Sequence, residues 1–92
     1  MSENYKDLDE IRKMINVGND FSPSIRKTNQ NKYSIFFQLR GTNRGYDLIK
    51  QRRSDRPICI RYFSTSDATL DQVQKLGFKM VVIKFLDTEF NA

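Results

Sequence analysis

Residues 65–86, TSDATLDQVQKLGFKMVVIKFL, carry the clearest secondary-structure pattern in the chain. Three apolar residues recur at intervals of three in the first half of this stretch and so share one stripe of a helix over residues 65–78: Leu70, Val73 and Leu76. Gly77 is placed to end this helix in the left-handed conformation. Residues 79–86 are a continuous apolar run rich in β-branched side chains, which is typical of a strand inside a sheet. A helix that delivers a strand to a sheet favours an α+β fold.

A second helix is predicted near the N-terminus, within residues 1–18. Four apolar residues there lie three or four positions apart: Tyr5, Leu8, Ile11 and Ile15. Gly18 supplies the stop. Residues 19–32 show no hydrophobic period and contain Pro23, so we expect a connector there.

The middle of the chain predicts an antiparallel meander. Residues 33–40 alternate in hydrophobicity and are followed by GTNRG, which is typical of a hairpin loop. Residues 46–53 alternate weakly and are either the return strand or a short helix. Residues 58–64 form the next strand. We expect one set of side chains on these strands to face the helices: Ile35, Phe37, Leu39, Ile58, Ile60 and Tyr62.

Taken together, these elements predict one domain over residues 1–92, because a chain of this length has room for one core. The order is α-β-β-β-α-β, giving a four-stranded, mostly antiparallel sheet with two helices packed on one face. The β-β-β-α-β core covers residues 33–86, the last strand lies inside the sheet, and residues 87–92 form a frayed tail.

Charge is strongly polarised along the chain. The net charge is +5 and the pI about 9.6. The segment from Arg26 to Arg61 holds ten basic residues against two acidic ones, whereas the remainder holds six basic and nine acidic residues. A basic concentration of this kind favours a polyanionic partner. A solvated face that keeps the protein soluble is the alternative.

Several kinds of chemistry are excluded by composition. The chain has no histidine, and Cys59 is its single cysteine. Ordinary zinc sites and Ser-His or Cys-His nucleophile pairs therefore cannot form, and no cofactor or metal is expected. The single thiol agrees with a reducing compartment, and we find no signal peptide and no apolar run of membrane-spanning length. We therefore expect a cytoplasmic protein that does not bind a membrane.

The side of the predicted sheet away from the helices carries aromatic residues and arginines. Phe36 and Phe63 are the candidates for stacking on bases, unless they form a second core face or a dimer surface. The candidates for phosphate contacts are Arg40, Arg44, Lys50, Arg52, Arg53, Arg56 and Arg61. Neither helix is basic, so we expect RNA, or a strand bound without sequence specificity, rather than a major groove of duplex DNA as the ligand.

The sequence therefore favours a non-enzymatic nucleic-acid-binding protein. A small ribonuclease that uses arginine and tyrosine is a second class, but no acid–base pair is identifiable. A third class is an inhibitor that binds a host enzyme or toxin, or a ribonucleoprotein, through its basic surface. A homodimer is compatible with each of these classes.

Two resemblances concern phages. The usage of Asn, Lys, Ile, Phe and Tyr in a compact chain resembles that of small early proteins of T-even-type tailed phages, many of which redirect host transcription, RNA decay or defence systems. The order of YSIFFQLR, PICIRYFS and TLDQVQKLGFKMVVIKF also resembles the double-wing DNA-binding domain of a phage middle-promoter activator. These resemblances imply a modulator of a host nucleic-acid or defence system that acts in the host cytoplasm.

Overall fold

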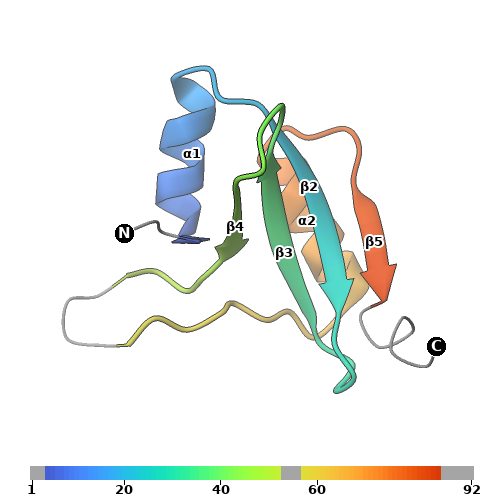
Figure 1. Ribbon diagram of the computed structural model, residues 1–92. Coiled ribbons are helices and arrows are strands. Elements are labelled where there is room, and N and C mark those ends of the chain that lie inside the picture. The colour runs from blue at the N-terminus through green and yellow to red at the C-terminus, as the bar shows by residue number, and fades with distance from the viewer. Residues whose placement is uncertain (1–3, 53–56, 86–92) are drawn as a thin grey trace.

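The computed structural model describes residues 4–52 and 57–85, which form two helices and a five-stranded mixed sheet (Figure 1). The elements in chain order are β1 (Tyr5–Lys6), α1 (Leu8–Asn16), β2 (Phe21–Lys27), β3 (Tyr33–Leu39), β4 (Gly45–Leu48), α2 (Ser66–Lys75) and β5 (Val82–Phe85). The strand order is β1-β4-β3-β2-β5. Strand β3 pairs antiparallel with β2 and β4, whereas the outer pairs β1–β4 and β2–β5 are parallel. The α+β class is confirmed, and the prediction of four strands is wrong.

One face of the sheet carries the core. The strand residues of the buried apolar cluster lie an even number of positions apart along β2, β3 and β4, and they are Phe21, Ile25, Ile35, Phe37, Tyr46 and Leu48. Both helices pack on this same face, because Ile11 of α1 and Val73 of α2 belong to the same buried cluster. Figure 1 shows α2 behind β2 and β3 in this view. Alternation had placed Ile35 and Phe37 toward the helices, and this prediction is confirmed.

Strand β2 corrects the predicted connector over residues 19–32. Its side chains at Phe21, Pro23 and Ile25 are buried, whereas Ser22 between them is exposed. Proline normally disfavours a central strand, because it cannot donate a backbone hydrogen bond. It is tolerated here because β5 begins opposite Ser24, so Pro23 pairs with β3 alone. Phe21, Pro23 and Ile25 do alternate with serines, as in a strand, but the proline led us to interpret this segment as a connector.

Both helices begin and end by local rules. Asp7 caps α1 and exchanges backbone-to-side-chain hydrogen bonds of 2.9 Å with Glu10, which is a capping box. Thr65 caps α2 through a hydrogen bond from the Ala68 N–H. Gly18 and Gly77 adopt φ values of 102° and 98°, as expected for residues that end helices. No helix in residues 4–52 and 57–85 is long and apolar enough to cross a membrane.

Residues 49–52 and 57–63 form an extended two-stranded segment, here called the arm, at the lower left of Figure 1. The Lys50 N–H donates to the carbonyl of Cys59 at 2.9 Å, and Ile49 pairs with Ile60. Residues 46–52 contain no helix, so the return-strand alternative is the correct one. The predicted strand over 58–64 exists only as isolated pairings at Ile60 and Phe63.

The last strand also differs from its prediction. Strand β5 starts at Val82 and lies at the edge of the sheet rather than inside it. Its residues Val82 and Ile83 are 58% and 44% exposed. The apolar composition of 79–86 indicated burial on both faces, but a parallel partner on one side only leaves much of this surface in solvent.

Candidate nucleic-acid interface

The basic residues are divided between the two ends of β3. Lys32 precedes this strand, whereas Arg40 and Arg44 follow it. Seven residues of strand separate these ends by roughly 20 Å. Lys50, Arg52 and Arg61 belong to the arm, whereas the candidates Arg53 and Arg56 lie outside the residues that the structure describes. The described cations therefore do not form one continuous surface.

Two of the candidate arginines are held by carboxylates. The Arg40 guanidinium lies 3.1 Å from Asp20, with both side chains exposed. Arg52 is bound more extensively: its Nε donates to Glu10 at 2.9 Å and its Nη2 to the carbonyl of Tyr5 at 2.7 Å. The Arg52 backbone N–H also donates to Asp7. Arg52 therefore fastens the arm to the first turn of α1, a structural role that local sequence did not reveal.

Phe36 lies on the open face of the sheet, as expected, but its ring is covered. The Arg26 guanidinium stacks on it, 4.2 Å from the ring centroid, and reaches across to Asp47 at 3.7 Å. The ring tip rests against Gly45, where a Cβ would lie 2.1 Å from the ring. Phe36 is therefore the middle layer of a stack rather than a free platform for a base.

Burial of the Asp47 carboxyl raises its pKa, and the Arg26 guanidinium beside it opposes this only in part. A raised pKa means that the folded state binds the proton more tightly than the unfolded state does. Ionisation of Asp47 therefore costs stability as the pH rises above the ordinary value of an aspartate.

We expect Asp47→Asn to gain stability relative to the wild type as the pH increases. The gain should be near zero at about pH 3, where the carboxyl is protonated in both states, and should level off once the carboxyl is ionised in both states. Urea unfolding of both proteins across this range measures it. A variant that loses stability relative to the wild type toward neutral pH would show that the ion pair with Arg26 outweighs burial.

The other predicted stacking residue lies on the wrong side for that role. Phe63 packs against the core cluster and pairs with Tyr33 through backbone hydrogen bonds of 2.9 and 2.7 Å. The Arg61 guanidinium lies 4.9 Å from its ring centroid. Ile58 and Tyr62, which were expected to face the helices, are instead 50% and 51% exposed. The alternation of this segment was assigned to the wrong faces, because the arm does not continue the sheet.

A groove between the arm and the turn that joins β2 to β3 gathers free cations. Its volume is about 620 Å³, and its walls are Thr28, Asn29, Gln30, Lys32, Lys50, Ile60 and Tyr62. None of these residues is acidic. Lys32 and Lys50 are exposed and form no ion pair with a carboxylate among residues 4–52 and 57–85.

The turn side of the groove is preorganised. The Thr28 hydroxyl accepts hydrogen bonds from the N–H groups of Gln30 and Lys32, and the Thr28 N–H donates to the Lys32 carbonyl at 2.8 Å. Asn31 adopts a φ of 61°, a conformation that asparagine tolerates better than most residues. Lys32 is thus presented on a fixed turn.

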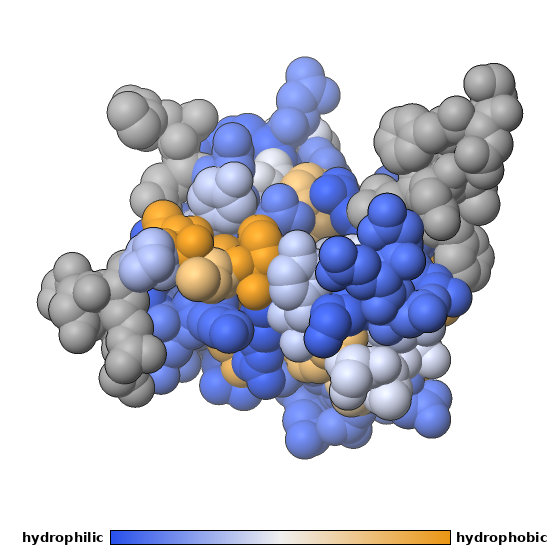
Figure 2. All heavy atoms as spheres, turned by 90° about the horizontal axis from the view of Figure 1, so that it is seen from below, coloured by the Kyte–Doolittle hydropathy of each residue, from blue (hydrophilic) through white to orange (hydrophobic). Residues whose placement is uncertain are grey.

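The two elements that line the groove, the β2–β3 turn and the arm, lie on the lower side of the ribbon in Figure 1, and Figure 2 views the molecule from below. That side is largely hydrophilic, with one apolar patch on it. Of the candidates named from sequence that lie in the described part of the chain, only Lys50 lines this groove. Sequence reasoning missed Lys32 because it stood outside the arginine-rich stretch, and it missed Tyr62 because strand alternation assigned it to the core.

The groove can bind an anion and offers a ring beside it. Two ammonium groups attract phosphates, the amides of Asn29 and Gln30 can donate or accept hydrogen bonds, and Tyr62 exposes about half of its surface. No cluster of three or more metal-ligating side chains occurs in the part of the chain that the structure describes. No protein-family model, no curated protein and no solved structure matches this chain.

Proposed function

We propose that this protein binds single-stranded nucleic acid, RNA in preference to duplex DNA, in the groove between the β2–β3 turn and the arm. The observation that carries the proposal is the placement of Lys32, Lys50 and Tyr62 around one groove, where none of the wall residues that the structure describes is acidic. Phosphates would lie against the two ammonium groups, and a base would stack on the tyrosine ring.

The helices support a single strand over a duplex. Each presents acidic side chains in its first turn, Asp9 and Glu10 in α1 and Asp67 in α2. These carboxylates would repel the phosphates that flank a major groove, so neither helix suits the role of a recognition helix. An exposed ring beside two lysines is the arrangement by which proteins hold unstacked bases. We propose binding without catalysis; the wall residues that the structure describes offer no carboxylate or imidazole as a general base.

Binding to a labelled single-stranded RNA should weaken steeply with salt, and the two lysines should account for part of this dependence. Each phosphate neutralised contributes about −0.7 to the slope of log K against log salt on single strands. Replacing both Lys32 and Lys50 by alanine should therefore make the slope shallower by about 1.4. Fluorescence polarisation at several salt concentrations measures it.

Two comparisons make this test specific. Lys75→Ala removes an exposed lysine of α2 that is already paired with Asp71 at 3.0 Å, so it should leave the slope almost unchanged. Tyr62→Ala should weaken binding by about 1–3 kcal/mol without altering the slope, whereas Tyr62→Phe should retain affinity. An unchanged slope in the double lysine variant would remove this groove as the phosphate site. RNA shortened during the titration would instead reveal an enzyme.

In a cell, such binding suits a small modulator of host RNA or of a defence system, acting in the cytoplasm of an infected host. The second candidate function is direct inhibition of a host protein. One observation favours it. Exposed apolar residues cluster at the start of β5, which lies away from the end of β2 that borders the groove.

A further inference from the structure

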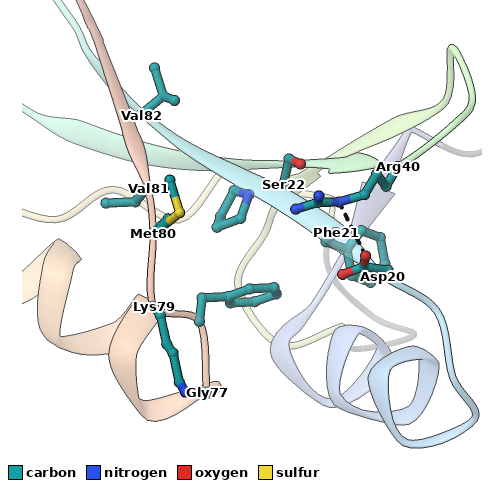
Figure 3. Close-up of a pocket in the computed structure, with 11 residues that line it drawn as sticks. Asp20, Phe21, Ser22, Arg40, Gly77, Lys79, Met80, Val81 and Val82 are labelled. Atoms are coloured by element: carbon teal, nitrogen blue, oxygen red, sulfur yellow. Dashed lines mark ion pairs between the residues drawn. The ribbon is translucent and has the colours of Figure 1, made fainter.

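A cleft opens where β5 separates from β2. The two strands pair from Ser24 and Val82 onward, whereas the chain just before Val82 lies in no ladder of the described sheet. Figure 3 shows the result: Lys79 and Met80 stand on one wall, and Ser22 and Arg40 lie toward the other. The cleft has a volume of about 410 Å³. Cavities of this size accept small ligands or large side chains.

The rim of this cleft exposes an unusual amount of apolar surface. Met80 is 83% exposed, and Val82 and Ile83 are 58% and 44% exposed. Phe78 and Pro23 add further apolar lining. Three large apolar side chains exposed within four consecutive residues mark an interaction site, because edge strands are normally protected against contacts of this kind.

Charge around the cleft indicates the partner. Lys79 lines the cleft and is exposed. Lys84 is also exposed and lies two residues beyond Val82 in β5, opposite Arg26 in the β2–β5 register. Among the lining residues that the structure describes, Asp20 is the one carboxylate, and it is already paired with Arg40 at 3.1 Å. A second copy of this edge would bring the same positive charges into contact and be repelled. An acidic partner would be attracted.

We propose that this cleft is a docking site for an extended, acidic segment of a partner protein. A large apolar side chain of that segment fills the cleft against Met80 and Phe78, and flanking carboxylates lie near Lys79 and Lys84. The site is separate from the nucleic-acid groove, because the two lie at opposite ends of β2. Its occupation therefore does not depend on RNA binding.

The test uses the full chain and a fluorescent synthetic peptide that alternates aspartate with leucine around one central phenylalanine. The peptide should bind saturably. Replacing its aspartates by asparagine should weaken binding about tenfold or more, and replacing its phenylalanine by alanine should weaken it about fivefold or more. Met80→Asp should also cost about tenfold, since it brings a carboxylate to the apolar wall. Because Met80 is exposed, this change should leave the fold intact, which circular dichroism can verify.

The matched control is the double alanine variant of Lys32 and Lys50, which should bind the peptide as the wild type does. Conversely, Met80→Asp should leave RNA binding unchanged. Equal binding of the asparagine peptide, no effect of Met80→Asp, or no saturable binding would each overturn the proposal. Concentration-dependent dimers that Met80→Asp abolishes, without peptide binding by the wild type, would assign the cleft to a second copy instead.

Discussion

Replacement of Phe37 by alanine is expected to lower the free energy of unfolding by about 3–5 kcal/mol. Phe37 lies at the centre of β3 and has no exposed surface. Its ring meets Phe21 edge-on at a centroid distance of 5.9 Å and lies 6.1 Å from Phe78. Truncation would remove these contacts and leave a cavity between the sheet and α2. Since small domains are stable by about 5–15 kcal/mol in total, the variant should be partly unfolded or close to it.

The control for this prediction is the neighbouring residue. Phe36 points to the opposite face and is partly exposed, so Phe36→Ala removes the same number of atoms from a site that solvent can fill. Its loss should be about 1–2 kcal/mol, with most of it from the contact with Arg26. Urea unfolding of both variants measures the difference. Equal losses would mean that the core face of β3 has been assigned incorrectly.

The second large effect is expected at Gly45. A Cβ built there would lie 2.1 and 2.6 Å from two carbons of the Phe36 ring, which no real side chain tolerates. The ring cannot simply rotate outward, because the Arg26 guanidinium covers it and is tied to Asp47. We therefore expect Gly45→Ala to destabilise the protein by at least the roughly 1–3 kcal/mol that is typical of overpacking.

A double variant tests the cause. The three closest atoms to the new Cβ all belong to Phe36, so Gly45→Ala should be nearly neutral when Phe36 is already alanine. The interaction free energy from the cycle should then be about 1–3 kcal/mol. Additive losses would show that backbone conformation at Gly45, and not the ring, makes glycine necessary.

The arm links the fold to the proposed binding site. Lys50, Ile60 and Tyr62 can form one wall of the groove because Arg52 holds the arm against Asp7 and Glu10 of α1. The acidic residues at the start of α1 therefore contact the arm as well as capping the helix. Their carboxylates help to hold the arm in place, together with the backbone hydrogen bonds that join Ile49 to Lys6 and Phe63 to Tyr33.

The features that depend on local periodicity and local chemistry could be predicted from the amino-acid sequence alone. Helices α1 and α2, the glycines that end them, and the buried face of β3 all follow from spacing within a single segment. Composition likewise predicted a basic chain without the residues for a zinc site or a histidine-based nucleophile. Neither kind of inference requires knowledge of what a segment packs against.

The features that could not be predicted are those that depend on contacts between residues distant in the chain. Pro23 is tolerated in a paired strand because β5 begins opposite Ser24. Strand β5 is exposed because, among the described strands, it pairs with β2 alone. Contacts between distant residues also divide the candidate cations into two kinds. Arg52 forms an ion pair with Glu10, forty-two residues away, whereas Lys50 pairs with no carboxylate among the described residues. The residue type is the same whether a side chain is held by tertiary contacts or left exposed. Only its neighbours in space determine whether it is structural or is available to bind.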